Sequence, residues 1–375
     1  MTVFSHRPTL RWVLPLLAAL LLVSGGSVVG LLTATARGGL PERTAAQLLV
    51  DVQRARLDGL SGTIVQNAEL GLPSLPGIGG SGSSDLTSLI SGSHTLRLWY
   101  AGPNRVRLAL LGSLGESDLV RNGRDLWVWS STKGSATHHD VPLSEDAPTS
   151  LASVSPVTPQ QAAEAALDAV SPSTKVTTDG TAVVAGRSAY ELVLEPRDTR
   201  SLVTSVRIAV DGRTHVPTRV QVFADGVSKP AFSVGFTSFD PSRPDASVFR
   251  FNPPPGTKVE EGSSMGRAPH AGPLSGPGPL SGLLTGEPQV VGTGWTSVLV
   301  AKVAPELTSA SGGSGRNGED GPAAGVLGML PEVSGSWGSG RLLRGTLFSA
   351  LVTDDGQVVI GAVRPELLYA ALPRR

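Results

Sequence analysis

The sequence predicts a mainly β protein of the α+β class, built on an antiparallel sheet. Short runs of alternating apolar residues are joined by turn-forming dipeptides, namely Asn122-Gly123, Asp211-Gly212 and Asp225-Gly226. Strands separated by so few residues pair as antiparallel neighbours, because parallel strands need a long crossover connection. Two segments with helix-start signals, at Thr44 and Thr158, add a small helical part.

A hydrophobic segment lies within residues 1–36 and predicts export. Residues 12–32 carry no charge, and at about 1.5 Å per residue they could cross a bilayer core of about 30 Å. Arg7 and Arg11 precede the run, which places the N-terminus inside and the rest of the chain outside. Residues 34–36, Ala-Thr-Ala, fit a signal-peptidase site. The segment is therefore either a membrane anchor on the extracytoplasmic face or a signal peptide cleaved after Ala36, which would release a secreted protein.

The composition excludes several kinds of chemistry. Lys+Arg and Asp+Glu both number 31, so no overall charge attracts nucleic acid. The chain has no cysteine, which excludes a disulfide, a thiolate metal site, a cysteine nucleophile and a lipid-modified N-terminal cysteine. Gly (46) and Pro (29) concentrate in turns and in two further segments. We expect residues 262–286 to be a linker and residues 308–324 a low-complexity insert.

Helix and strand signals alternate along the first half of the chain. Thr44 and Gln47 have the spacing of a capping box, and apolar residues at 45, 48, 49 and 52 form one stripe of a helix that ends near Gly59. Residues 94–100 and 105–111 alternate as strands do, and Asn122-Gly123 predicts a type I′ hairpin. Leu-Trp-Val-Trp at 126–129 is apolar on both strand faces. This strand is covered on both sides, or one face lines an apolar cavity.

The second half continues the pattern and ends in a small module. A second helix begins at Thr158-Pro159 and runs over 158–170. Four strands follow, at 189–194, 205–210, 218–223 and 232–236. The module at 287–375 is α+β: it has a strand at 295–303, a hairpin at 341–363 closed by Asp-Asp-Gly at 354–356, and a terminal helix at 365–372.

No pattern for catalysis or metal binding fits its surroundings. Residues 262–266 match G-x-S-x-G, but the Pro- and Gly-rich continuation cannot form the helix that a nucleophile elbow needs. His-His-Asp at 138–140 lacks metal-site spacing and indicates a solvated loop. Asp-Asp-Gly at 354–356 lacks the further ligands of a calcium loop, and Glu116 and Asp118 are too isolated to form an acid–base pair. We therefore expect no catalytic residue, no metal and no cofactor.

The order of these parts resembles the LolA-like superfamily, which holds outer-membrane lipoprotein carriers and the N-terminal domain of MucB/RseB-type sigma-factor regulators. The resemblance covers residues 41–261 and rests on five segments: TAAQLLVDVQRARLDGLSGTIVQ, HTLRLWYAGPNRVRL, DLVRNGRDLWVW, TPQQAAEAAL and FRFNPPPGTKVEE. It implies a curved antiparallel half-barrel closed by helices, with an apolar cavity that takes acyl chains. The module at 287–375 is not part of the simple carriers.

Seven strand residues are the candidate cavity wall. Aromatic residues at alternating strand positions supply a large apolar area at little cost in side-chain entropy. We expect the tryptophans to face the concave side and to share one wall with the phenylalanines; the alternative is ordinary core. The candidates are Trp99, Trp127, Trp129, Phe223, Phe232, Val234 and Phe236.

These expectations describe a non-enzymatic binding protein of the cell envelope that holds an acyl chain, a lipid or a lipidated protein. The alternative, implied by the likeness to MucB/RseB, is an envelope-sensing regulatory protein that contacts a membrane-bound partner. The added module and an uncleaved anchor favour that alternative, since a shuttle must leave its membrane. A hydrolase comes third, because no catalytic constellation supports it.

Overall fold

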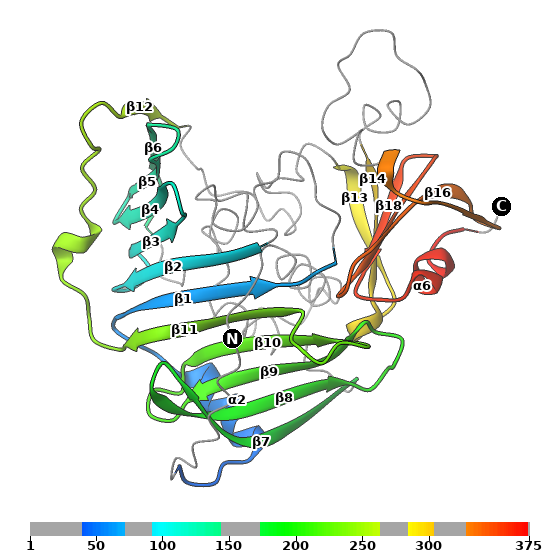
Figure 1. Cartoon of the computed structure of the whole chain (residues 1–375), viewed down its shortest axis with the longest axis horizontal. Helices are drawn as coiled ribbons and strands as arrows, with labels where there is room; N and C mark the ends of the chain where they lie inside the picture. The colour runs from blue at the N-terminus through cyan, green and yellow to red at the C-terminus, as the bar shows by residue number, and fades with distance from the viewer. Residues whose placement is uncertain (1–39, 72–91, 144–172, 263–283, 304–327, 374–375) are drawn as a thin grey trace.

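The described residues form two β-sheets, of twelve and six strands, whose arrangement Figure 1 shows. The computed structural model describes residues 40–71, 92–143, 173–262, 284–303 and 328–373. The predicted fold class, mainly β on an antiparallel sheet, is confirmed, and the larger sheet is open, consistent with the half-barrel that the resemblance implied. The strands of the larger sheet are β1 (Leu60–Ala68), β2 (Gly92–Tyr100), β3 (Arg105–Leu111), β4 (Glu116–Asn122), β5 (Asp125–Ser130), β6 (Ser135–Asp140), β7 (Thr174–Val184), β8 (Arg187–Pro196), β9 (Val203–Asp211), β10 (Pro217–Ala224), β11 (Phe232–Asp240) and β12 (Lys258–Glu261).

The larger sheet has the order β12-β6-β5-β4-β3-β2-β1-β11-β10-β9-β8-β7. Neighbours pair antiparallel except β12, which pairs with β6 in parallel and so departs from the all-antiparallel sheet that we expected. The smaller sheet has the order β13-β14-β18-β17-β16-β15. Its strands are β13 (Leu284–Val291), β14 (Val298–Val303), β15 (Glu332–Gly335), β16 (Gly338–Arg344), β17 (Ser349–Thr353) and β18 (Gln357–Gly361).

Helix α2 (Ala45–Arg54) begins at the predicted capping box. The Thr44 hydroxyl accepts a hydrogen bond from the Gln47 amide at 3.2 Å, and the Thr44 amide donates to Gln47 Oε1 at 2.9 Å. The helix ends at Arg54, earlier than the predicted end near Gly59. Leu48 and Val52 are buried against the larger sheet, so the predicted apolar stripe is the face that holds the helix in place.

One face of the larger sheet, here called the inner face, carries the main core. Leu110, Leu96, Ile64 and Phe236 lie opposite one another across β3, β2, β1 and β11, and each is at most 5% exposed. The core also takes in residues 347–348 from the turn between β16 and β17. The two sheets therefore share a core, although the sequence indicated a small module joined by a linker.

Several local predictions need correction. The β4–β5 turn has Gly123 and Arg124 at its centre, with positive φ only at Gly123 (68°), so it has the II′ arrangement and not I′. Trp295 lies in the 3₁₀ helix η4 (Gly294–Thr296), before the strand that was expected to include it. Residues 284–286 belong to β13, although they were expected in the linker. The terminal helix α6 (Pro365–Ala370) is confirmed.

Some expectations lie outside the described residues. They are the hydrophobic segment at 1–36, the helix at 158–170, residues 263–266 of the G-x-S-x-G match, and the insert at 308–324. Within the part of the chain that the structure describes, no helix has the length and apolar character needed to span a membrane.

Gly62, in the central strand β1, tests how tightly the inner face is packed. A Cβ there would lie 2.4 Å from the Ser238 carbonyl oxygen and 2.7 Å from Phe236 Cδ1. We expect Gly62→Ala to lower the free energy of unfolding by about 2–3 kcal/mol, because the added methyl group would overlap the Ser238 carbonyl and the backbone there cannot move aside without strain. Urea unfolding measures it, with Gly328→Ala as the control, since nothing lies within 4 Å of a Cβ at that position. Equal stability of the two variants would contradict the packing described above.

Candidate functional site

The seven predicted wall residues lie on opposite faces of the larger sheet. Leu98, Leu126 and Val222 belong to the main core. Since strand side chains alternate, their neighbours Trp99, Trp127, Trp129 and Phe223 project from the other face, here called the outer face. The inner face carries Phe232, Val234 and Phe236. The expectation that tryptophans and phenylalanines share one concave wall is therefore wrong.

The three inner-face residues are packed core. Phe232 and Val234 are fully buried and Phe236 is 5% exposed. Phe236 also meets Phe239 edge-on, with ring centroids 5.0 Å apart. Their contacts stabilise the sheet in the conformation that the structure describes.

The outer face carries a cross-strand row over β2 to β6. Pairing places Trp99, Arg107, Val120, Trp127 and His138 opposite one another in that order. The Arg107 guanidinium lies 5.5 Å from the centre of the Trp99 ring. At the other end, Trp127 stacks on His138 with ring centroids 4.4 Å apart. A basic group therefore faces an aromatic ring at each end of the row.

Residues 245–262, here called the covering segment, pass over this row (Figure 1). Its 3₁₀ helix η3 (Ala246–Phe249) contacts β3 and β4, and Phe249 is 1% exposed. Phe251 lies 5.4 Å from Trp127 and 6.3 Å from Trp129, measured between ring centroids. Strand β5 is thus covered on both sides, which is one of the two arrangements that its sequence allowed.

Asp118 is buried on this outer face beside Arg107. Its side chain is 1% exposed, and Arg107 donates to it while also donating to the Val248 carbonyl at 3.4 Å. Burial raises the pKa of Asp118 to about 6, against the opposing effect of Arg107, and the nearby Glu116 raises it further. Asp118 Oδ1 and the indole N–H of Trp129, its cross-strand neighbour, are both buried without a partner. The judgement from sequence that Asp118 is isolated missed Arg107, because the ion pair depends on strand register.

His138 is part of strand β6, so the expectation of a solvated loop at 138–140 is wrong. Its two ring nitrogens lie 3.0 Å from an Asp125 oxygen and 3.1 Å from a Glu261 oxygen. Among the described residues, no group of three or more His, Asp or Glu side chains is arranged to hold a metal ion.

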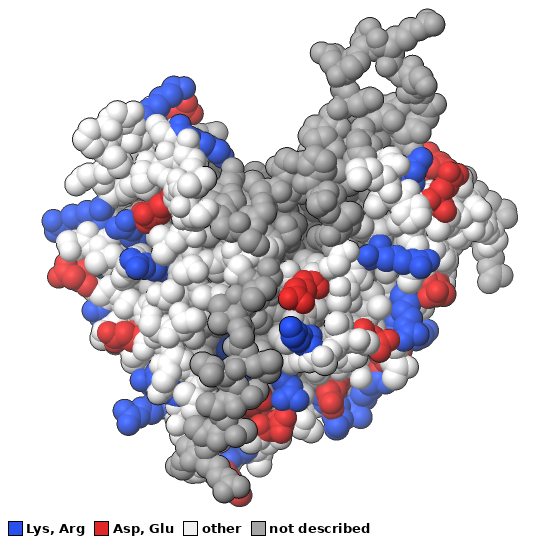
Figure 2. All heavy atoms as spheres, in the orientation of Figure 1, with Lys and Arg blue, Asp and Glu red and all other residues white. Residues whose placement is uncertain are grey.

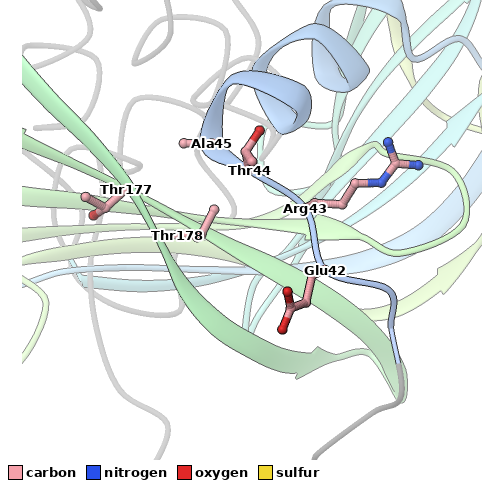
Figure 3. Close-up of a pocket in the computed structure, with 6 residues that line it drawn as sticks. All are labelled: Glu42, Arg43, Thr44, Ala45, Thr177 and Thr178. Atoms are coloured by element: carbon pink, nitrogen blue, oxygen red, sulfur yellow. The ribbon is translucent and has the colours of Figure 1, made fainter.

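A pocket of about 610 Å³ lies between the start of α2 and the edge strand β7 (Figure 3). Thr178 lies opposite Leu192, a fully buried inner-face residue, so the pocket adjoins the edge of the apolar core. Arg43, at the rim, lies 3.4 Å from Asp51. The lining residues are Glu42, Arg43, Thr44, Ala45, Thr177 and Thr178. None of the seven predicted residues lines this pocket. The residues that do line it are mostly polar residues at a strand edge and before a helix, and they carry no distinctive pattern by which the sequence could have identified them.

Charged side chains are mixed in sign over the face drawn in Figure 2. Lys/Arg and Asp/Glu residues lie side by side there, in keeping with the net charge of zero. A surface of this kind gives no long-range attraction of one sign for a charged partner.

The structure is similar to MucB of Pseudomonas aeruginosa, solved in complex with MucA, at 16% identity and a TM-score of 0.42, covering 88% of this chain and 98% of that one. It is also similar to a LolA superfamily protein from Nitrosomonas europaea (10% identity, TM-score 0.22, 56% and 99% covered). A conserved uncharacterized protein from Thermus thermophilus has 11% identity and a TM-score of 0.33, with 58% and 98% covered. No family model and no curated protein matches the sequence. The matched structures include both groups that the sequence resembles.

Asp118 predicts a pH dependence of stability. Its pKa is raised in the folded protein from 3.8 to about 6, so the folded state binds the proton more tightly and is favoured at low pH. This contribution to the free energy of unfolding is on the order of 3 kcal/mol. It is fully present below about pH 4 and is lost as the pH rises to about 6. We expect Asp118→Asn to remove that slope in urea unfolding measured from pH 4 to 6.5.

The control for this experiment is Asp179→Asn, which removes a carboxylate that is 58% exposed. It should leave the slope between pH 4 and 6 unchanged. Asp211 acts in a different window: its pKa is lowered to about 2, because hydrogen bonds from Arg187 and Thr214 outweigh the opposing effect of burial. Its contribution is therefore lost only as the pH falls below about 4. A wild-type slope that survives Asp118→Asn would show that another group binds the proton.

Proposed function

We propose that this chain is a non-enzymatic binding protein of the cell envelope that holds an acyl chain or lipid at the inner face of its larger sheet. The pocket between α2 and β7 is the entrance. The observation that carries the proposal is the position of this pocket, whose polar lining of Glu42, Arg43 and three threonines lies next to the apolar core of the inner face. An amphipathic ligand needs this combination, because its head stays in water while its chain is buried.

Helix α2 is suited to admit such a ligand. It is 10 residues long, and Leu48 and Val52 are its only fully buried side chains. The Tyr190 hydroxyl donates to the Pro41 carbonyl at 2.9 Å and so holds the segment that precedes the helix. In this proposal the acyl chain takes the place of α2 on the inner face. Each CH₂ group that is buried there contributes about 0.8 kcal/mol, so an acyl chain of ordinary length can offset the loss of the contacts that Leu48 and Val52 make.

The extracytoplasmic location is part of the same proposal. It is supported by Arg7 and Arg11 ahead of an uncharged run at 12–32. Either outcome for that run, anchor or cleaved signal, leaves the pocket on the side of the membrane where exported lipids and lipoproteins are handled.

A second candidate is the regulatory protein that contacts a membrane-bound partner. The observation that favours it is the firm attachment of the smaller sheet, which a simple carrier does not need. Arg364 donates to Asp225 at 2.6 Å, the Trp295 indole donates to Thr174 at 2.7 Å, and the Thr346 amide donates to the Leu70 carbonyl at 2.7 Å. A partner that binds across both sheets would therefore contact a single connected surface.

Protection of a single thiol tests the lipid proposal, because the natural chain has no cysteine. In Thr178→Cys the new thiol lines the pocket. We expect decanoate or lysophosphatidylcholine, each below its critical micelle concentration, to slow maleimide labelling of this thiol about tenfold at saturation. The same ligands should raise the melting temperature, since they bind only the folded state.

Thr204→Cys is the matched control, because Thr204 is an exposed strand threonine that does not line the pocket. Its labelling rate should not respond to the ligands. Unchanged labelling of both variants together with an unchanged melting temperature would overturn the lipid proposal. The regulatory candidate would then lead.

A further inference from the structure

Strand β12 is held on the edge of the larger sheet by few contacts. It is four residues long, all of them exposed, and it pairs only with β6. The Lys258 amide donates to the Gly134 carbonyl at 2.8 Å, and the Gly262 amide donates to the His138 carbonyl at 2.7 Å. Because these four residues bury little surface, side-chain contacts add to the backbone pairing in holding the strand.

The His138 side chain supplies such contacts. Nε2 lies 3.0 Å from Oδ1 of Asp125 on β5, and Nδ1 lies 3.1 Å from Oε2 of Glu261 on β12. A carboxylate only accepts hydrogen bonds, and a neutral imidazole has a single N–H to donate. Both contacts can be hydrogen bonds only when the ring carries two protons, so the arrangement requires the imidazolium form.

The surroundings of the ring also favour the charged form. The face of Trp127 lies against it, with ring centroids 4.4 Å apart and planes 26° apart. Asp125 and Glu261 face the ring from the two neighbouring strands. On its own strand, Asp140 is the nearest carboxylate and is itself held by Arg124 at 2.9 Å. Negative charge and an aromatic face thus surround a single titratable base.

We propose that His138 is a proton-controlled clamp that fastens β12, and with it the end of the covering segment, to the edge of the larger sheet. The protonated ring bridges β5 and β12. When the ring loses a proton, it can donate to only one of the two carboxylates, and β12 then separates from β6 more readily.

The pH range of the clamp follows from its bonds. Although burial lowers the pKa of His138, the hydrogen bonds to Asp125 and Glu261 raise it above the ordinary 6.5. A raised pKa means that the stabilisation is complete below about pH 6.5 and is lost as the pH rises through the folded-state pKa. The clamp is therefore closed in mildly acidic surroundings and weakened in alkaline ones.

Proton NMR of the histidine C–H signals tests the protonation step. We expect the His138 signal to titrate above pH 6.5 in the natural chain, and at lower pH in Glu261→Gln and in Asp125→Asn. Glu260→Gln is the matched control, because Glu260 pairs with Lys258 and makes no bond to His138. The Glu261 side chain is 77% exposed, so its variant keeps the fold. Titration of His138 at or below pH 6.5, or equal shifts in the Glu260 and Glu261 variants, would overturn the proposal.

Hydrogen exchange of the Gly262 amide tests the structural step. After correction for the intrinsic effect of pH, we expect its protection to fall about fivefold between pH 5.5 and pH 8.5, the loss expected for one exposed charged pair. In His138→Gln the protection should be low and independent of pH. Protection in the natural chain that does not change with pH would show that β12 is held without the clamp.

Discussion

The pairing register of the larger sheet decides which side chains can meet. Because successive residues of a strand point to opposite faces, one pairing assigns every side chain of twelve strands to the inner or the outer face. Leu126 and Trp127 are neighbours in sequence, yet Leu126 joins the main core and Trp127 stacks on His138. A slip of one residue in β5 would exchange these roles, and both the core and the outer row would be lost.

The outer face shows why a sheet can need a cover on its second side. Asp118 and its cross-strand neighbour Trp129 bring polar atoms to a place that the covering segment closes to water. Burial of a carboxylate costs several kcal/mol unless a partner compensates, and Arg107 compensates only one of its two oxygens. The protein therefore holds Asp118 nearer to its neutral form, and the same cover that protects the tryptophans makes this face sensitive to protons.

The sequence predicted helices and strands better than it predicted the face of the sheet on which a side chain lies. Local rules sufficed for the capping box at Thr44 and for the span of β3, since each depends on residues close together in the chain. They failed for β1, the strand that joins the two halves of the larger sheet, because LSGTIVQNA alternates weakly and one of its partners, β11, lies far along the chain. The Asp118 and His138 contacts were missed for the same reason. Each joins residues of different strands, and the bond from His138 to Glu261 spans 123 positions.

The two faces differ in what they carry. The inner face holds the main apolar core, which lies next to the pocket beside α2, where the ligand of the proposed function would enter. The outer face is aromatic and ionisable, and its cover ends at β12 and Gly262. Gly262 packs so closely on the His139 ring that a Cβ would lie 2.1 Å from it. The Gly262 amide also donates to the His138 carbonyl. A change in how β12 is held therefore also changes the contacts of Gly262, the residue that follows β12. Proton binding on one face and ligand binding on the other can therefore act on the same sheet without sharing a residue.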